Sequence, residues 1–286
     1  MDSLNNELKQ STMQLILKRV LLISLLLISL SCKEEKVSPE KIDNLICFWD
    51  FSEEAGQKRK TKAGKCNYIL CEGARTIPKA QDGVFGNHSA VIMEGDWFCI
   101  PRNECPELNI HGEKAQVTVV AWVKRAKKMY NQCEAIAGIW DETNKHRQYC
   151  LFLDLRIWES SQQVGGHVSG VGGPTDGYKY CMDASIGATK VPLDIWQCIG
   201  FTYDGEKICS YLNGVLDARN NQNPYSYPLG LHDGGIKGGD FTVGAVNRSG
   251  EMGNFFVGQI GGLAVYDRAL TKEEMAYLAS NITDEQ

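Results

Sequence analysis

The stretch IWQCIGFTYDGEKICSYLNGVLDA, residues 195–218, decides the fold. Two runs within it are rich in aromatic and β-branched residues, and they end in the dipeptides Asp204-Gly205 and Asn213-Gly214. Both dipeptides are typical of two-residue hairpin turns, because the two central positions of a type I′ turn need positive φ. The stretch therefore predicts an antiparallel meander, and a meander needs a second layer to bury its apolar face.

Four segments extend this prediction to most of residues 45–278. They are FWDFSE at 48–53, VTVVAWV at 117–123, WQCIGFTYDGEKICSYLNG at 196–214 and GQIGGLAVYDRALTKEEM at 258–275. In this order they resemble the laminin-G-like branch of the concanavalin A-like lectin/glucanase superfamily. The resemblance implies an all-β, concanavalin A-like jelly-roll β-sandwich. Thr271, with Glu274 three residues later, has capping-box spacing and adds a short C-terminal helix.

One domain, residues 45–280, accounts for the length of 286 residues. The formal net charge of −5 argues against a nucleic-acid partner, which requires a basic face. Residues 1–32 are expected to be a leader and residues 33–44 a tether.

The leader has a basic pair, Lys18-Arg19, then an apolar run at 20–30 that is too short to span a bilayer, and then Cys32. It resembles a bacterial lipoprotein signal, which implies that Cys32 carries the lipid. Met13 would make a more ordinary start than Met1, because MQLILKRV opens a signal of normal length. An uncleaved anchor helix would need about 20 apolar residues. The sequence KEEK after Cys32 resembles the tag that sends lipoproteins to the outer face of the outer membrane. We therefore expect a surface-exposed outer-membrane protein that contacts the membrane only through its lipid.

Ten further cysteines allow disulfides in an exported protein. Cys66 and Cys71 are the bridge candidates, and few bridges are expected because other cysteines lie within predicted strands. No pair has the C-x2-C spacing of zinc sites. The resemblance raises Ca²⁺ as a ligand, but the strand before YDRAL reads GQIGG, without the family's acidic pair. We expect no cofactor and no metal.

Residues 147–158 are predicted to form a strand with an apolar core face and a mixed face that suits the inner, solvent-reachable side of a curved sheet. The core face is Tyr149, Leu151, Leu153, Leu155 and Ile157, and the solvent-reachable face is Cys150, Phe152, Asp154, Arg156 and Trp158. Residues 163–189 contain seven glycines and are predicted to be a long loop that forms the wall of a cleft.

A hydrolase of this superfamily would carry its carboxylates on one strand as E-x-D-x-x-E, and the sequence has no such run. Asp154 and Glu159 are five residues apart, which places them on opposite faces of a regular strand. No G-x-S-x-G motif is present either. We therefore name no catalytic residue.

Sugar rings stack on aromatic faces, and planar polar side chains hydrogen-bond their hydroxyls. The residues that we expect to bind a glycan are Trp140, Asp141, Arg156, Trp158, His167, Tyr178, Tyr180 and Asp183. Core packing of the tryptophans and a structural Asp154–Arg156 ion pair are the alternatives. The sequence predicts a non-catalytic glycan-binding module. A hydrolase or lyase of unrecognised pattern is the second hypothesis, and a protein–protein adhesion module is the third.

Overall fold

The computed structural model describes Met13 and residues 37–282 of the chain. The predicted leader, including Cys32, and the first part of the predicted tether lie outside the described residues apart from Met13. The described domain belongs to a compact unit that begins at Val37.

The first sheet of the domain is built around the meander. Its strands, in spatial order, are β14 (Val215–Leu216), β13 (Lys207–Leu212), β12 (Trp196–Tyr203), β7 (Val117–Arg125), β19 (Gly258–Tyr266), β5 (Ser89–Ile92) and β4 (Lys79–Ala80), with β1 (Leu45–Trp49) beside β19 and β15 (Tyr225–Ser226) beside β13. Every pairing in this sheet is antiparallel.

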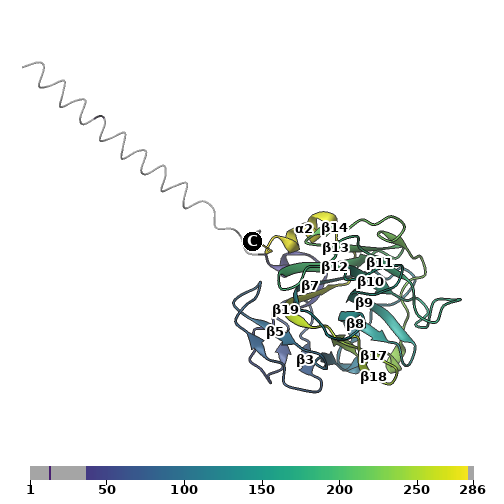
Figure 1. The fold of residues 1–286 in the computed structure, drawn as a ribbon, viewed down its shortest axis with the longest axis horizontal. Helices are drawn as coiled ribbons and strands as arrows, with labels where there is room; N and C mark the ends of the chain where they lie inside the picture. Colours follow the sequence, from purple (N-terminus) through teal and green to yellow (C-terminus); the bar gives the residue numbers. More distant parts are fainter. Residues whose placement is uncertain (1–12, 14–36, 283–286) are drawn as a thin grey trace, which may run out of the picture. The chain divides into compact units, whose positions relative to one another are not determined.

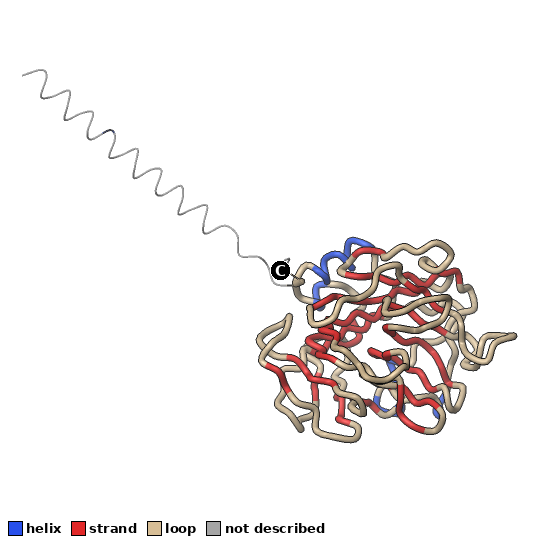
Figure 2. Tube along the Cα trace, viewed as in Figure 1, coloured by secondary structure: helices blue, strands red, loops and turns tan. Residues whose placement is uncertain are grey.

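The second sheet is made mainly from the middle of the chain. Its order is β11 (Ala184–Ile186), β10 (Val164–Val168), β9 (His146–Leu153), β8 (Glu134–Asp141), β16 (Phe241–Val243), β6 (Phe98–Ile100), β3 (Ile69–Glu72) and β2 (Arg59–Lys60), with β17 (Val246–Arg248) beside β8 and β18 (Glu251–Gly253) beside β17. Short 3-10 turns lie at η1 (Pro39–Lys41), η2 (Arg102–Glu104), η3 (Pro106–Leu108) and η4 (Gly235–Lys237). Figure 2 shows that strands and loops make up almost all of the domain. The predicted all-β sandwich with a short C-terminal helix is confirmed.

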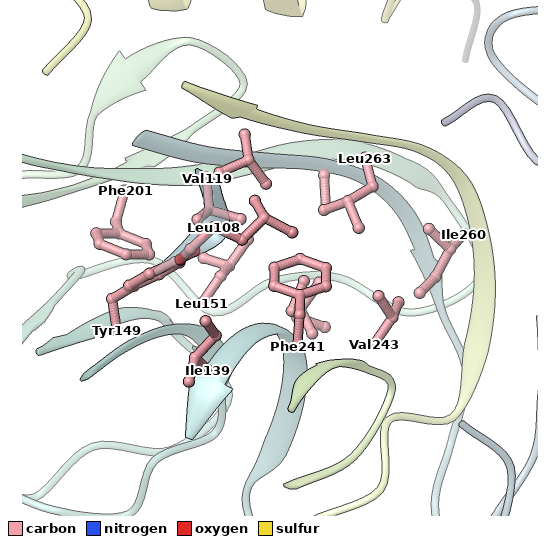
Figure 3. Close-up of a cluster of buried hydrophobic side chains, with 14 of the residues drawn as sticks. Leu108, Val119, Ile139, Tyr149, Leu151, Phe201, Phe241, Val243, Ile260 and Leu263 are labelled. Atoms are coloured by element: carbon pink, nitrogen blue, oxygen red, sulfur yellow. The ribbon is translucent and has the colours of Figure 1, made fainter. Parts of the chain in front are cut away.

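The main core lies between the two sheets. Val119, Ile260 and Leu263 of the first sheet face Ile139, Leu151 and Phe241 of the second, and all six are fully buried (Figure 3). Tyr149, Leu151 and Leu153 of β9 belong to this core, as their alternation predicted.

A second apolar cluster covers the outer face of the first sheet. The helix α2 (Lys272–Ala279) begins at the predicted capping box and lies beside β13 and β14 (Figure 1). Trp122 of β7 donates its indole N–H to the carbonyl of Leu278 at 3.1 Å. Val37 packs into the same cluster, so the segment expected to be a tether is part of the domain from Val37 onward. The physical reason is the hydrophobic effect, because the apolar side chains of Val37 and Ile42 are buried against the outer face of the first sheet.

The two turns of the meander differ in type. Asn213 and Gly214 both have positive φ, of 49° and 76°, as a type I′ turn requires. In the first turn Asp204 pairs with Lys207, so Gly205 and Glu206 are the central residues. The Asp204 carboxylate accepts hydrogen bonds from the backbone N–H groups of Glu206 and Lys207. These side-chain hydrogen bonds hold Asp204 at the first position of the turn and not at one of its two central positions.

Two other expectations about the chain are corrected. The structure divides the predicted 163–189 loop into β10, a loop and β11, because Gly165 and Gly166 pair with both β9 and β11. All ten cysteines of the described part of the chain are free, including Cys66 and Cys71. Cys71 lies opposite Cys99 across the β3–β6 pair rather than opposite Cys66.

Candidate ligand-binding site

The outer face of the second sheet carries three aromatic rings from neighbouring strands. Trp140, Phe152 and His167 come from β8, β9 and β10. Neighbouring residues of a strand point to opposite faces, so Ile139 enters the core while Trp140 joins the outer cluster. The Trp140 and His167 ring centroids are 4.3 Å apart, and those of Trp140 and Phe152 are 5.7 Å apart.

These three rings form the floor of a pocket of about 480 Å³, which we call the main pocket. Its walls come from five segments of the chain. The remaining lining residues are Asn131, Gln132 and Cys133 before β8, Glu142 and Arg147 around the β8–β9 turn, Leu155, Arg156 and Ile157 after β9, Tyr180 and Cys181 after β10, and Arg248 and Asn254 near β17 and β18.

The wall after β9 exists because the strand ends at Leu153. Asp154, Arg156 and Trp158 all have left-handed backbone conformations, with φ between 50° and 61°. The Asp154 carboxylate accepts a hydrogen bond from the N–H of Gln162 at 3.0 Å, which closes the loop. The predicted strand therefore stops five residues early, and Leu155 packs against the outer cluster instead of the core.

A buried ion network supports this wall. Glu134 accepts hydrogen bonds from Arg125 and lies 3.0 Å from Lys128, and Asp154 lies 2.9 Å from Lys128 and 3.0 Å from Arg156. Burial alone would raise the pKa of Asp154, but hydrogen bonds from Lys128 and Arg156 outweigh it and lower that pKa. Asp154 therefore stays ionised and holds the loop.

The opposite wall is a polar network. Arg147 donates to the carbonyl of Gly172 at 3.2 Å, and its guanidinium lies 3.9 Å from the Glu142 carboxylate. Asn254 accepts from Arg248 at 2.8 Å and donates to Glu142 at 3.4 Å. These contacts fix the direction of planar groups that can hydrogen-bond hydroxyls or anions.

His167 is a neutral member of the floor. Burial lowers its pKa to about 3, so the imidazole is uncharged near neutral pH. Its Nδ1 lies 3.1 Å from the carbonyl of Asp183, and the neutral ring donates from Nδ1 because a carbonyl can only accept. Nε2 is then an acceptor.

Four of the eight residues expected to bind a ligand line the main pocket. They are Trp140, Arg156, His167 and Tyr180. Tyr180 is about half exposed at the rim, whereas Trp140 and His167 are buried in the floor.

The other four make structural contacts beside the pocket. Asp141 accepts two hydrogen bonds from Asn144 in the β8–β9 turn. Trp158 donates to the carbonyl of Met182 at 3.0 Å and meets the Tyr178 ring edge-on. Asp183 accepts from Thr175 at 2.5 Å and from the Tyr225 hydroxyl at 3.3 Å. The structure does not bring these four side chains into the pocket.

Sequence reasoning missed several pocket residues. Alternation places Phe152 on the same face of its strand as Arg156, but Phe152 was not named as a site residue. Its position on the strand next to that of Trp140 could have indicated that the two rings are neighbours. Arg147 lies opposite Trp140 because the β8–β9 register shifts at this point, whereas strict alternation would have placed Arg147 on the core face with Tyr149. Arg248 and Asn254 come from a hairpin about 100 residues later, and nothing in the sequence signals their position.

Two further depressions adjoin the main pocket. One of about 590 Å³ follows residues 125–131 and shares Asn131 and Arg156 with the main pocket. The other, of about 320 Å³, shares Gln132 and Arg248 with it. The site is therefore an extended surface of linked depressions.

Neither a metal-binding cluster nor a membrane-spanning helix is present in the described part of the chain. No group of three or more His, Cys, Asp or Glu side chains there is arranged to hold a metal ion. No helix among the same residues is long and apolar enough to cross a membrane.

The domain is a sandwich of two sheets. The outer face of one sheet is covered, and the outer face of the other carries a pocket lined by aromatic rings. These features define a β-sandwich of the lectin-like class. A family model described as the concanavalin A-like lectin/glucanases superfamily matches residues 102–276, and the chain belongs to this superfamily. No curated protein matches the sequence.

Solved structures share the fold. Domain 4 of an extracellular GH43 arabinanase from Geobacillus stearothermophilus, in complex with arabinotriose, has a TM-score of 0.54 and 19% identity over 82% of this chain and 98% of that chain. The binding domain of Paraclostridial mosquitocidal protein 1 has a TM-score of 0.53 and 14% identity over 83% of this chain and 52% of that chain. The binding domain of botulinum neurotoxin serotype G has a TM-score of 0.52 and 12% identity over 83% and 51%. The chain spans about half the length of the two toxin structures, and at these identities the likeness concerns the fold.

Proposed function

We propose that the domain binds a glycan in the main pocket without cleaving it, and that a lipid on Cys32 holds the protein at the outer face of the outer membrane. The single observation that carries the binding proposal is the composition of the pocket. Three aromatic rings form its floor, and planar polar side chains stand around it. Sugar rings require this combination of apolar faces and hydrogen-bonding edges.

The fold also supports a sugar ligand. The arabinanase domain has the same fold and was solved in complex with arabinotriose. In the present chain the aromatic floor belongs to the second sheet, whose outer face is left open, while α2 and the N-terminal segment cover the outer face of the first sheet. A ligand therefore has access to one sheet only.

The carboxylates favour binding over hydrolysis. Two carboxyl groups about 5–10 Å apart, both facing the bond to be cleaved, are the usual requirement for glycoside hydrolysis. Among the described residues that line the main pocket, Glu142 is the only carboxylate, and Arg147 and Asn254 contact it. Asp154 lines the adjoining depression, where Lys128 and Arg156 neutralise it.

Tyr180 and Tyr178 provide a matched test of the proposal. The two side chains are 49% and 50% exposed on the same loop, and only Tyr180 lines the pocket. Residues 33–286 would be screened against a panel of polysaccharides for retention and for release of reducing ends. We expect retention without release, and Tyr180→Ala weakens it about 2- to 12-fold, the equivalent of one aromatic contact of about 0.5–1.5 kcal/mol.

Tyr178→Ala is the control, and it should bind as the wild type does. Equal losses in the two variants would contradict the assignment of the site. Release of reducing ends would replace the binding proposal by an enzymatic one, and absence of any retention would overturn the glycan proposal.

A further inference from the structure

The charge around the site is opposite to the charge of the chain. The whole chain has a formal net charge of −5. The main pocket and the depression that shares Asn131 and Arg156 with it are lined by Arg125, Lys127, Lys128, Arg147, Arg156 and Arg248, against the carboxylates of Glu142 and Asp154. The protein is acidic overall, so a local excess of cations at this site is not explained by a need for solubility and indicates a role in binding.

Two of these cations are occupied by buried carboxylates. Arg125 forms a bidentate contact with Glu134 and also donates towards the carbonyl of Val191. Lys128 lies 3.0 Å from Glu134 and 2.9 Å from Asp154. Both side chains are almost fully buried, so their role is to hold the loop before β8 against the loop after β9.

Arg147 is also largely occupied. It donates to the carbonyl of Gly172, it faces Glu142 at 3.9 Å, and its guanidinium lies 6.0 Å from the centre of the Trp140 ring. Arg147 therefore compensates the one carboxylate in the wall of the main pocket. Lys127 lies on the exposed rim of the adjoining depression.

Arg156 and Arg248 retain unused donors at the main pocket. Arg156 directs Nε and Nη2 to one oxygen of Asp154, and its side chain is 40% exposed. Arg248 donates from Nη1 to Asn254, and within the described residues neither its Nε nor its Nη2 has a hydrogen-bond partner. The two guanidinium groups reach the pocket from different segments, the loop after β9 and the strand β17.

We propose that the ligand is an acidic glycan, whose carboxylate or sulfate groups bind to Arg156 and Arg248 while a sugar ring lies over the aromatic floor. This inference rests on the proposed function. Planar guanidinium donors match the geometry of both oxyanions. A neutral glycan would leave the excess positive charge of the pocket without a counter-charge, whereas an acidic glycan supplies it.

The test measures the binding of residues 33–286 by calorimetry to polygalacturonate, dextran sulfate and unmodified dextran, at about 50 mM and about 500 mM NaCl. We expect binding to at least one acidic polymer, weaker binding at high salt because charges are screened, and little binding to dextran. Arg156→Gln and Arg248→Gln should each weaken the binding about tenfold or more, the equivalent of one charge-assisted hydrogen bond.

Lys60→Gln is the matched control, since Lys60 is an exposed cation on β2 at the far edge of the second sheet. It should leave affinity unchanged, and thermal unfolding of all variants verifies that they are folded. Tighter binding to polygalacturonate would identify a carboxylate as the anionic group that the arginines bind, and tighter binding to dextran sulfate would identify a sulfate ester.

Two results would overturn the acidic-ligand inference while leaving glycan binding in place. One is equal affinity for neutral and acidic polymers with no effect of either arginine substitution, although Tyr180→Ala still weakens binding. The other is an equal loss in Lys60→Gln, which indicates unspecific attraction. Absence of binding to every glycan, neutral ones included, would overturn both proposals.

Discussion

His167 contributes to the pocket as an uncharged aromatic ring. It is buried against Trp140 and Phe152, and burial, together with the nearby charge of Arg147, lowers its pKa to about 3. A histidine in the unfolded chain has a pKa of about 6.5. Between these two values the unfolded chain binds a proton that the folded chain does not, so His167 destabilises the fold as the pH falls.

We predict that replacing His167 with Gln reduces the acid sensitivity of the domain. For the wild type, this residue lowers the free energy of unfolding by about 1.4 kcal/mol for each pH unit below about 6.5, until the pH reaches the folded pKa. Denaturant unfolding at several pH values from 4 to 7 measures the slope. His111→Gln removes an exposed imidazole as a control. Identical slopes in the wild type and His167→Gln would show that His167 does not carry this effect.

At the level of elements, the Asn213-Gly214 turn connects β13 and β14 and also lies against α2. A Cβ atom on Gly214 would come within 2.6 Å of the Ala276 Cα and 2.8 Å of the Met275 carbonyl oxygen. The glycine is therefore required twice, for its φ of 76° and for the close approach of the helix. The sequence predicts the first requirement, and only the packing of α2 imposes the second.

Gly214→Ala and Gly177→Ala separate these two requirements. Gly177 has a φ of 78° with nothing within 4 Å of the position of a Cβ, so its substitution introduces backbone strain alone, of about 1 kcal/mol. Gly214→Ala should cost about 1–3 kcal/mol more, because the helix must move from the sheet. Chemical denaturation of both variants measures the difference. Equal destabilisation would mean that α2 adjusts without cost.

Strands and loops were predictable to different degrees. The outer and core faces of residues 149–153 follow the two-residue period, because a regular strand has one side chain on each face in turn. The period fails from Asp154 onward, where its carboxylate and the left-handed residues end the strand. Composition does not reveal a loop whose conformation depends on an ion pair between Asp154 and Lys128, because Lys128 lies in another segment of the chain.

For the whole molecule, the two outer faces of the sandwich have different roles. The chain itself covers the first sheet with α2 and the segment from Val37. The second sheet carries the pocket. With a lipid at Cys32, a short distance before Val37, we propose that the protein presents this second face to glycans outside the cell.

We predict that Cys32→Ala releases the protein from the membrane. Without the thiol no lipid can be attached, and the apolar run at 20–30 is too short to anchor the chain as a spanning helix. Fractionation of a Gram-negative host and labelling with a fatty-acid analogue measure the change. Cys66→Ala is the control and should stay in the membrane fraction. Unchanged retention of Cys32→Ala would contradict the anchor.

The sequence by itself determined the meander with its second turn, the faces of residues 149–153 and the capped helix, because turn dipeptides, two-residue alternation and capping spacing are local properties. The β-sandwich as a whole was expected from the resemblance to the superfamily. It also pointed to Trp140, Arg156, His167 and Tyr180. Only the tertiary structure decided that Asp141, Trp158, Tyr178 and Asp183 lie outside the pocket, and that Arg147, Arg248 and Asn254 complete it. These positions depend on strand register and on contacts between segments about 100 residues apart, which no local pattern encodes.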